Sequence, residues 1–141
     1  MKKFSSFFLL ILSFNLTSHE FNPAHLIIDQ SNDNQNIYDA TWMYPVKNIG
    51  KRADVIFPDM CNSKGSDPFV QGKYIIEKIS LECNESIKGK FIEIINLSVL
   101  TDALVTINFK EDTFEGLINV QKNKIEIPLV DQYYPTAYLY L

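Results

Sequence analysis

The stretch KYIIEKISLEC, residues 73–83, is the clearest strand in the sequence and decides the fold class. In its second half Ile79, Leu81 and Cys83 alternate with polar residues at positions 78, 80 and 82. Successive side chains of a strand point to opposite faces, so this alternation predicts a strand with one buried face. The stretch ends in one of the two cysteines of the chain.

The other cysteine, Cys61, lies in the connection DMCNSKGSDPFVQG, residues 59–72. Its glycines, proline, aspartates and serines predict a surface connection, either a functional loop or one simply held in place. In an exported chain the expected link is a disulfide between Cys61 and Cys83, which the chain-entropy model values at about 3 kcal/mol. The alternative is a metal-binding thiolate pair, but neither cysteine has a histidine or further cysteine nearby in sequence.

The N-terminus has the layout of a secretory signal peptide, predicted to be residues 1–18. Lys2 and Lys3 precede the apolar run FSSFFLLILSFNL, residues 4–16, and the sequence then turns polar. The run is too short to span a bilayer comfortably, which takes about 20 residues. Cleavage after Ser18 would make His19 the first residue of the mature protein, whereas an uncleaved signal anchor is the alternative.

Charge and length restrict the class of protein further. Residues 1–18 carry two lysines and no acid, so their removal changes the net charge from −4 to −6. An acidic chain of this kind lacks the basic surface that nucleic acid requires, so no nucleic-acid partner is expected. Residues 19–128 have the length and apolar content of a single exported domain, in the periplasm or another extracytoplasmic space.

The rest of the mature chain consists of short apolar segments separated by turn-forming residues. Tyr38, Ala40, Trp42 and Tyr44 share one face of a segment that Pro45 ends, because proline cannot donate to a sheet ladder. Trp42 is therefore expected in the core rather than on a binding platform. Further strands are expected at residues 25–30, 53–57, 91–97, 103–110, 114–120 and 124–127. About seven or eight short strands without a helical period predict an all-β fold, an antiparallel β-sandwich.

The tail LVDQYYPTAYLYL, residues 129–141, is aromatic and apolar and has no closing charge. Tyrosine concentrates where a chain meets a bilayer, so one interpretation is the approach to a transmembrane helix. The other is a last strand packed on the sandwich. Composition alone leaves both interpretations open.

A series of short motifs runs along the chain in a fixed order. His19-Glu20 is followed by Pro23-Ala24 and the strand Leu26-Ile27-Ile28. A Tyr-x-x-x-Trp-x-x-Pro pattern comes next, formed by Tyr38, Trp42 and Pro45. A Phe-Pro-x-x-Cys element and a strand that ends in the second cysteine follow; these are Phe57, Pro58, Cys61 and Cys83. Residues 101–105 then read Thr-Asp-Ala-Leu-Val.

In order and spacing this set resembles the extracytoplasmic N-terminal region of the hydrogenase/urease accessory membrane proteins, the HupE/UreJ family. The resemblance covers nearly the whole mature chain, although each motif is short and mainly structural. Two positions depart from the family pattern. A Leu-x-Gly turn is here Ile87-Lys88-Gly89, and a Gly-Leu pair is Asn96-Leu97.

The resemblance implies a role in divalent metal uptake associated with nickel or cobalt enzymes. In the family this region precedes membrane helices that carry the transport histidines and acids, and residues 136–141 resemble the approach to the first helix. This chain ends at Leu141, before those residues. The implied role is an exported accessory or sensing domain at the membrane surface. Its partners would be the membrane helices of a HupE/UreJ-type permease or another membrane protein.

The mature N-terminus is the best candidate for metal binding. The α-amine and imidazole of His19 would suit Ni²⁺ or Cu²⁺, and Glu20, His25 and Asp29 could add ligands. His25 and Asp29 are four residues apart, so they are expected on the same side of a strand. The alternative is that the His-Glu pair is a processing signal or an edge-strand cap.

Catalytic motifs give no support for an enzyme. The sequence has no Gly-x-Ser-x-Gly elbow, phosphate-binding glycine loop or cluster of catalytic histidines, so no catalytic residues are expected. The second functional interpretation is an exported β-sandwich that binds a protein or glycan through a Tyr/Trp surface and the 59–72 connection.

Overall fold

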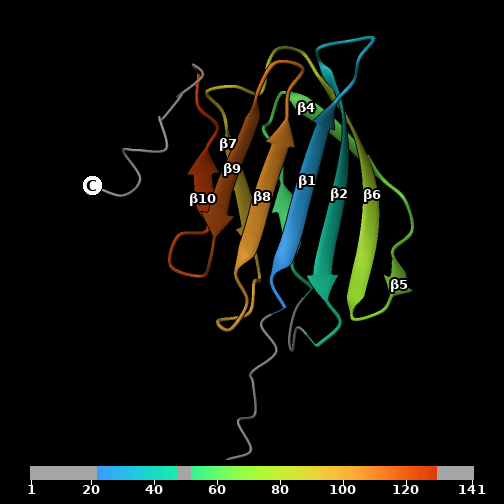
Figure 1. Cartoon of the computed structure of the whole chain (residues 1–141), viewed down its shortest axis with the longest axis vertical. Helices are drawn as coiled ribbons and strands as arrows, with labels where there is room; N and C mark the ends of the chain where they lie inside the picture. Colours follow the sequence, from blue (N-terminus) through green and yellow to red (C-terminus); the bar gives the residue numbers. More distant parts are fainter. Residues whose placement is uncertain (1–21, 48–51, 130–141) are drawn as a thin grey trace, which may run out of the picture.

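A computed structural model describes residues 22–47 and 52–129, which form ten strands in two sheets and contain no helix. The predicted all-β, sandwich-like fold is confirmed (Figure 1). The strands are β1 (Ala24–Gln30), β2 (Ile37–Pro45), β3 (Asp54–Ile56), β4 (Cys61–Gly65), β5 (Phe69–Gln71), β6 (Tyr74–Cys83), β7 (Phe91–Ile95), β8 (Ala103–Asn108), β9 (Thr113–Ile118) and β10 (Lys124–Glu126).

The larger sheet has the order β4-β6-β2-β1-β8-β9, and β5 pairs with β6 beside β4. Its pairings are antiparallel except that of β1 with β8, which is parallel, so the sheet is mixed. Parallel neighbours need a long crossover connection. Here the chain between β2 and β8 passes through the second sheet before it returns beside β1.

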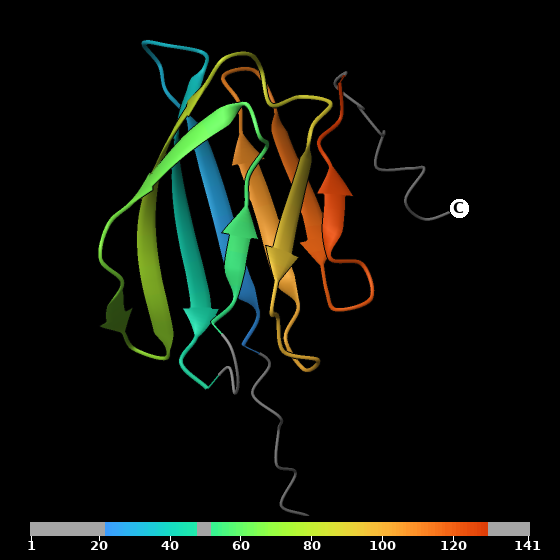
Figure 2. The same cartoon turned by 180° about the vertical axis from the view of Figure 1, so that it is seen from behind.

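The smaller sheet has the order β10-β7-β3 and covers one face of the larger sheet (Figure 2). The core lies between the two sheets. The predicted inward face of β2 is confirmed, with Tyr38 and Trp42 at most 1% exposed. Ile92 and Ile94 of β7 are equally buried. Alternation on both sheets thus gives one continuous core, as two packed sheets require.

Strand β6 confirms the alternation of the stretch at residues 73–83. Ile79, Leu81 and Cys83 are buried, and the residues between them are exposed. Tyr74 to Glu82 pair with β2 along its whole length, while β4 and β5 occupy the other edge of β6. This strand therefore joins the sheet interior to the connection that precedes it.

The prediction of a surface connection at residues 59–72 needs correction, because this segment contains β4 and β5. Both are exposed edge strands, so they pair with β6 through the backbone and need no alternation of apolar side chains. The disulfide prediction is confirmed. Cys61 and Cys83 face each other in the β4–β6 ladder, with a Cα–Cα distance of 4.0 Å and an S–S bond of 2.03 Å.

Candidate functional site

The predicted metal ligands lie at and before β1. His19 and Glu20 fall outside the described residues, whereas His25 and Asp29 both lie on the outward face of β1, as expected. Four residues along a strand span about 13 Å, and metal–nitrogen or metal–oxygen bonds are about 2 Å long, so one ion cannot bind both side chains. In the described part of the chain, no three His, Cys, Asp or Glu residues are grouped as metal ligands would be.

The neighbours of these two side chains also differ. The ring of His25 meets that of Tyr74 edge-on, with 6.3 Å between the centroids. Asp29 accepts a hydrogen bond of 2.7 Å from Nδ2 of Asn108 on β8. His25 can therefore act only with the N-terminal members of the predicted set, while Asp29 belongs to a different part of the sheet.

Asp29 lines a polar hollow of about 640 Å³ on the outward face of the larger sheet. Asp39 of β2 stands directly opposite it in the β1–β2 ladder, so two carboxylates face the same space. Nζ of Lys78 donates to Oγ1 of Thr41 at 3.1 Å, and both residues also line the hollow. Lys64 comes from β4, which the disulfide ties to β6. The hollow thus presents both charge signs on one rigid sheet.

A second hollow of about 410 Å³ shares Thr41 and Lys78 with the first and is more apolar. Its apolar wall consists of Met43, Phe69, Tyr74 and Ile76. Strand β5 places Phe69 opposite Ile76, and β2 places Met43 opposite Ile76 on the other side. Phe69 is part of this apolar wall because β5 pairs with β6.

Together the two hollows form one surface, called here the outward-face groove. One part offers carboxylates, lysines and hydroxyls, and the adjoining part offers two aromatic rings. Ligand sites commonly combine an apolar lining with a few polar groups that fix orientation. The groove could therefore bind an extended ligand with polar groups at one end and an apolar group at the other.

Sequence reasoning missed the aromatic part of this groove. Trp42 is 1% exposed and lies between the sheets, as expected, so it takes no part in a Tyr/Trp surface. Phe69 lies in the segment 59–72, which the sequence predicts to be a surface connection without strands. Strand β5 is only three residues long, too short for alternation to identify it, and its pairing with β6 brings Phe69 into one hollow with Tyr74 and Met43.

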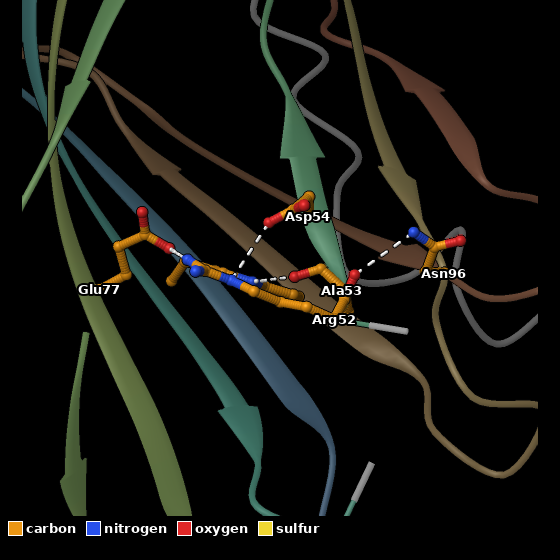
Figure 3. A network of polar contacts seen from close by, with 6 residues as sticks. Arg52, Ala53, Asp54, Glu77 and Asn96 are labelled. Atoms are coloured by element: carbon orange, nitrogen blue, oxygen red, sulfur yellow. Dashed lines mark hydrogen bonds and ion pairs between the residues drawn. The ribbon is translucent and has the colours of Figure 1, made fainter. Parts of the chain in front are cut away.

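A polar network at the edge of the core joins the two sheets (Figure 3). Arg52, just before β3, forms an ion pair with Glu77 on the inward face of β6 and a longer one of 3.4 Å with Asp54. Nε1 of Trp42 donates to the carbonyl of Ala53 at 3.1 Å, and Nδ2 of Asn96 donates to the carbonyl of Arg52 at 3.3 Å. These contacts fix β3 against β2 and β6.

Tyr44 lies beside this network, and its ring stacks on Trp42 with 5.8 Å between the centroids. Burial raises the pKa of the Tyr44 hydroxyl, and the positive charge of Arg52 opposes that shift. The hydroxyl is therefore protonated and neutral at physiological pH. The contacts of this network hold the two sheets together. They do not form a binding site.

Comparison with known proteins gives no match to any protein-family model and none to a curated protein. A search of residues 22–47 and 52–129 also finds no helix long and apolar enough to cross a membrane.

Proposed function

We propose that this protein is an exported accessory or sensing domain associated with divalent-metal uptake of the HupE/UreJ type. In this proposal the domain binds a nickel-like ion at the mature N-terminus and passes it to transport helices that lie outside this chain. Catalysis is not part of the role. The order of the short motifs along the chain supports it, together with an all-β fold that accommodates them.

The observation that carries the proposal is the pairing of the two motif cysteines. Cys61 closes the Phe-Pro-x-x-Cys element, and Cys83 ends the next long strand; the two form a disulfide across β4 and β6. A disulfide suits an oxidising, extracytoplasmic compartment. His25 adds support. Its side chain lies on the outward face near the start of β1, and the residue is close in sequence to His19 and Glu20.

Metal binding is tested by isothermal titration calorimetry of Ni²⁺ into protein whose first residue is His19. The expected result is one site that weakens at least about tenfold when His19 is replaced by Ala, because both amine and imidazole nitrogens suit this ion. His25→Ala is expected to weaken the same site less, since it would remove one supporting ligand.

Asp29→Asn is the matched control for the metal titration. It removes a carboxylate from the same face of β1 but about 13 Å from His25, so affinity for Ni²⁺ should not change. Equal binding by the His19→Ala variant, or no binding by the unaltered protein, would contradict the metal role.

A second candidate function is an exported binding module for a protein or glycan. The outward-face groove favours it, because β5 brings Phe69 beside Tyr74 next to the carboxylates of the polar hollow. An array of glycans and extracytoplasmic peptides would test this function. The double variant Phe69→Ser/Tyr74→Ala should abolish capture, whereas Leu129→Ser, at an exposed apolar residue after β10, should not.

The two functions separate on these measurements. Nickel binding that survives Phe69→Ser, which leaves the Tyr74 ring beside His25 in place, supports the accessory domain. Groove-dependent capture of a ligand without nickel binding supports the binding module.

A further inference from the structure

The two ends of the sandwich differ in the residues that form their turns. Strands β1, β6 and β8 begin at one end, where β2 and β9 finish; this end lies lower in Figure 1 and is called here the β1-start end. At the opposite end residues 31–36, 84–86 and 110–112 are polar, and the apolar turn residues Phe57 and Met60 are partly buried against the core. At the β1-start end, three separate turns carry exposed aliphatic residues instead.

The most exposed of these turns joins β7 to β8. The backbone N–H of Thr101 donates to the carbonyl of Ser98 at 2.9 Å, which closes a β-turn with Val99 and Leu100 at its two central positions. Their side chains are 81% and 88% exposed. Such positions are usually filled by Gly, Pro, Asn, Asp or Ser, so two large aliphatic side chains here are not explained by local turn chemistry.

The other two turns each carry one exposed valine and a lysine close to it in sequence. Val46 follows β2 and precedes Lys47, and Val120 lies two residues before Lys122 in the β9–β10 turn. Both valines are 45–46% exposed, and both lysines are exposed. We call Val46, Val99, Leu100 and Val120 the aliphatic turn tips.

The chain also enters the sandwich at this end. Pro23 leads into β1, and the backbone N–H of Ala24 donates to the carbonyl of Asp102, directly after the Val99–Leu100 turn, at 2.8 Å. In sequence, the apolar segment at residues 4–16 lies just upstream. An export leader or anchor would therefore join the domain beside the turn tips.

We propose that the aliphatic turn tips dock onto a lipid bilayer surface with anionic headgroups. The tips sit on separate turns, so each can enter the headgroup and acyl boundary individually, whereas a protein interface buries a continuous packed patch. Lys47 and Lys122 flank the tips and would pair with anionic headgroups. This docking is independent of metal binding and would place the aromatic part of the outward-face groove nearer the membrane than its polar part.

Vesicle co-sedimentation tests the docking, using protein purified from the extracytoplasmic fraction of cells that express the full chain. Binding is expected to vesicles that contain phosphatidylglycerol and to be weak with phosphatidylcholine alone. Leu100→Ser should weaken binding by about tenfold or more, since it removes the burial of a large aliphatic side chain. Lys47→Glu/Lys122→Glu should remove the preference for anionic vesicles.

Leu129→Ser is the matched control, because Leu129 is 72% exposed but lies at the opposite end, after β10. It should leave vesicle binding unchanged. A Leu100→Trp variant adds a direct readout: its added indole should shift to shorter emission wavelength on vesicles, while Trp42 is buried in the core. Full binding by the Leu100→Ser variant would overturn the proposal, as would binding to native membranes but not to protein-free vesicles, which would indicate a protein partner.

Discussion

Glu77 is a charged residue on an otherwise apolar inward face of β6. Ile75, Ile79 and Leu81 share that face, yet Glu77 stands opposite Trp42 in the β2–β6 ladder. Arg52 approaches from the other sheet and pairs with it. A carboxylate at this position is stable because its partner arrives across the gap between the sheets, which the periodicity of β6 alone does not indicate.

Substitution of Glu77 tests the strength of this contact. The Glu77→Gln variant should lose about 1–2 kcal/mol of unfolding free energy in urea, because its side chain is only 17% exposed and the charge pairs across the sheets. Asp54→Asn is the control. Its contact with the same guanidinium is longer and its side chain is 53% exposed, so the change should stay within about 0.5 kcal/mol. Equal losses in the two variants would show that the Glu77 pair has no special role.

Strands β4 and β5 are short elements whose stability depends on β6. Apart from the partly buried Cys61 all their residues are exposed, so burial of their other side chains cannot hold them. Backbone pairing with β6 and the disulfide at the start of β4 do so instead. These two strands complete both parts of the outward-face groove, through Lys64 and Phe69.

Removal of the disulfide tests this dependence at the level of the element. The Cys61→Ser/Cys83→Ser variant should lose about 3 kcal/mol of unfolding free energy, measured by urea denaturation, because the unfolded chain regains the entropy of the closed loop. Nickel binding at His19 should persist wherever the fold survives, since the bond lies where β6 ends and β2 begins, at the end of the sheet opposite the start of β1. Loss of nickel binding in a variant that remains folded would contradict the separation of the two sites.

The structural network and the two proposed binding surfaces occupy different parts of the molecule. The core and the Arg52–Glu77 network lie between the sheets, the groove lies on the outward face of the larger sheet, and the aliphatic turn tips lie at the β1-start end. The polar part of the groove therefore lies apart from the turn tips, whereas Tyr74 of its aromatic part pairs with Pro45, next to Val46. Strand β10 runs antiparallel to β7, away from the turn tips.

The sequence alone determined the strand character of the chain. Alternation in β2, β6 and β8 needs no tertiary information, because the period of two follows from the strand backbone itself. The cysteine pair was also predictable, since the signal-peptide pattern at residues 1–18 predicts export, and a disulfide is the expected link between two cysteines in an oxidising compartment. The prediction that His25 and Asp29 lie on the same side of a strand is confirmed, because alternation specifies the side to which each residue points.

Only the tertiary structure decided which strands are neighbours. The parallel β1–β8 pair, the pairing of edge strand β4 with β6, the hollow shared by Phe69 and Met43, and the Arg52–Glu77 contact all join residues distant in sequence. Local pattern cannot specify them, because strand pairing depends on backbone hydrogen bonds that any non-proline residue can make. Burial of the two inward faces against each other selects one arrangement among the many that these bonds allow.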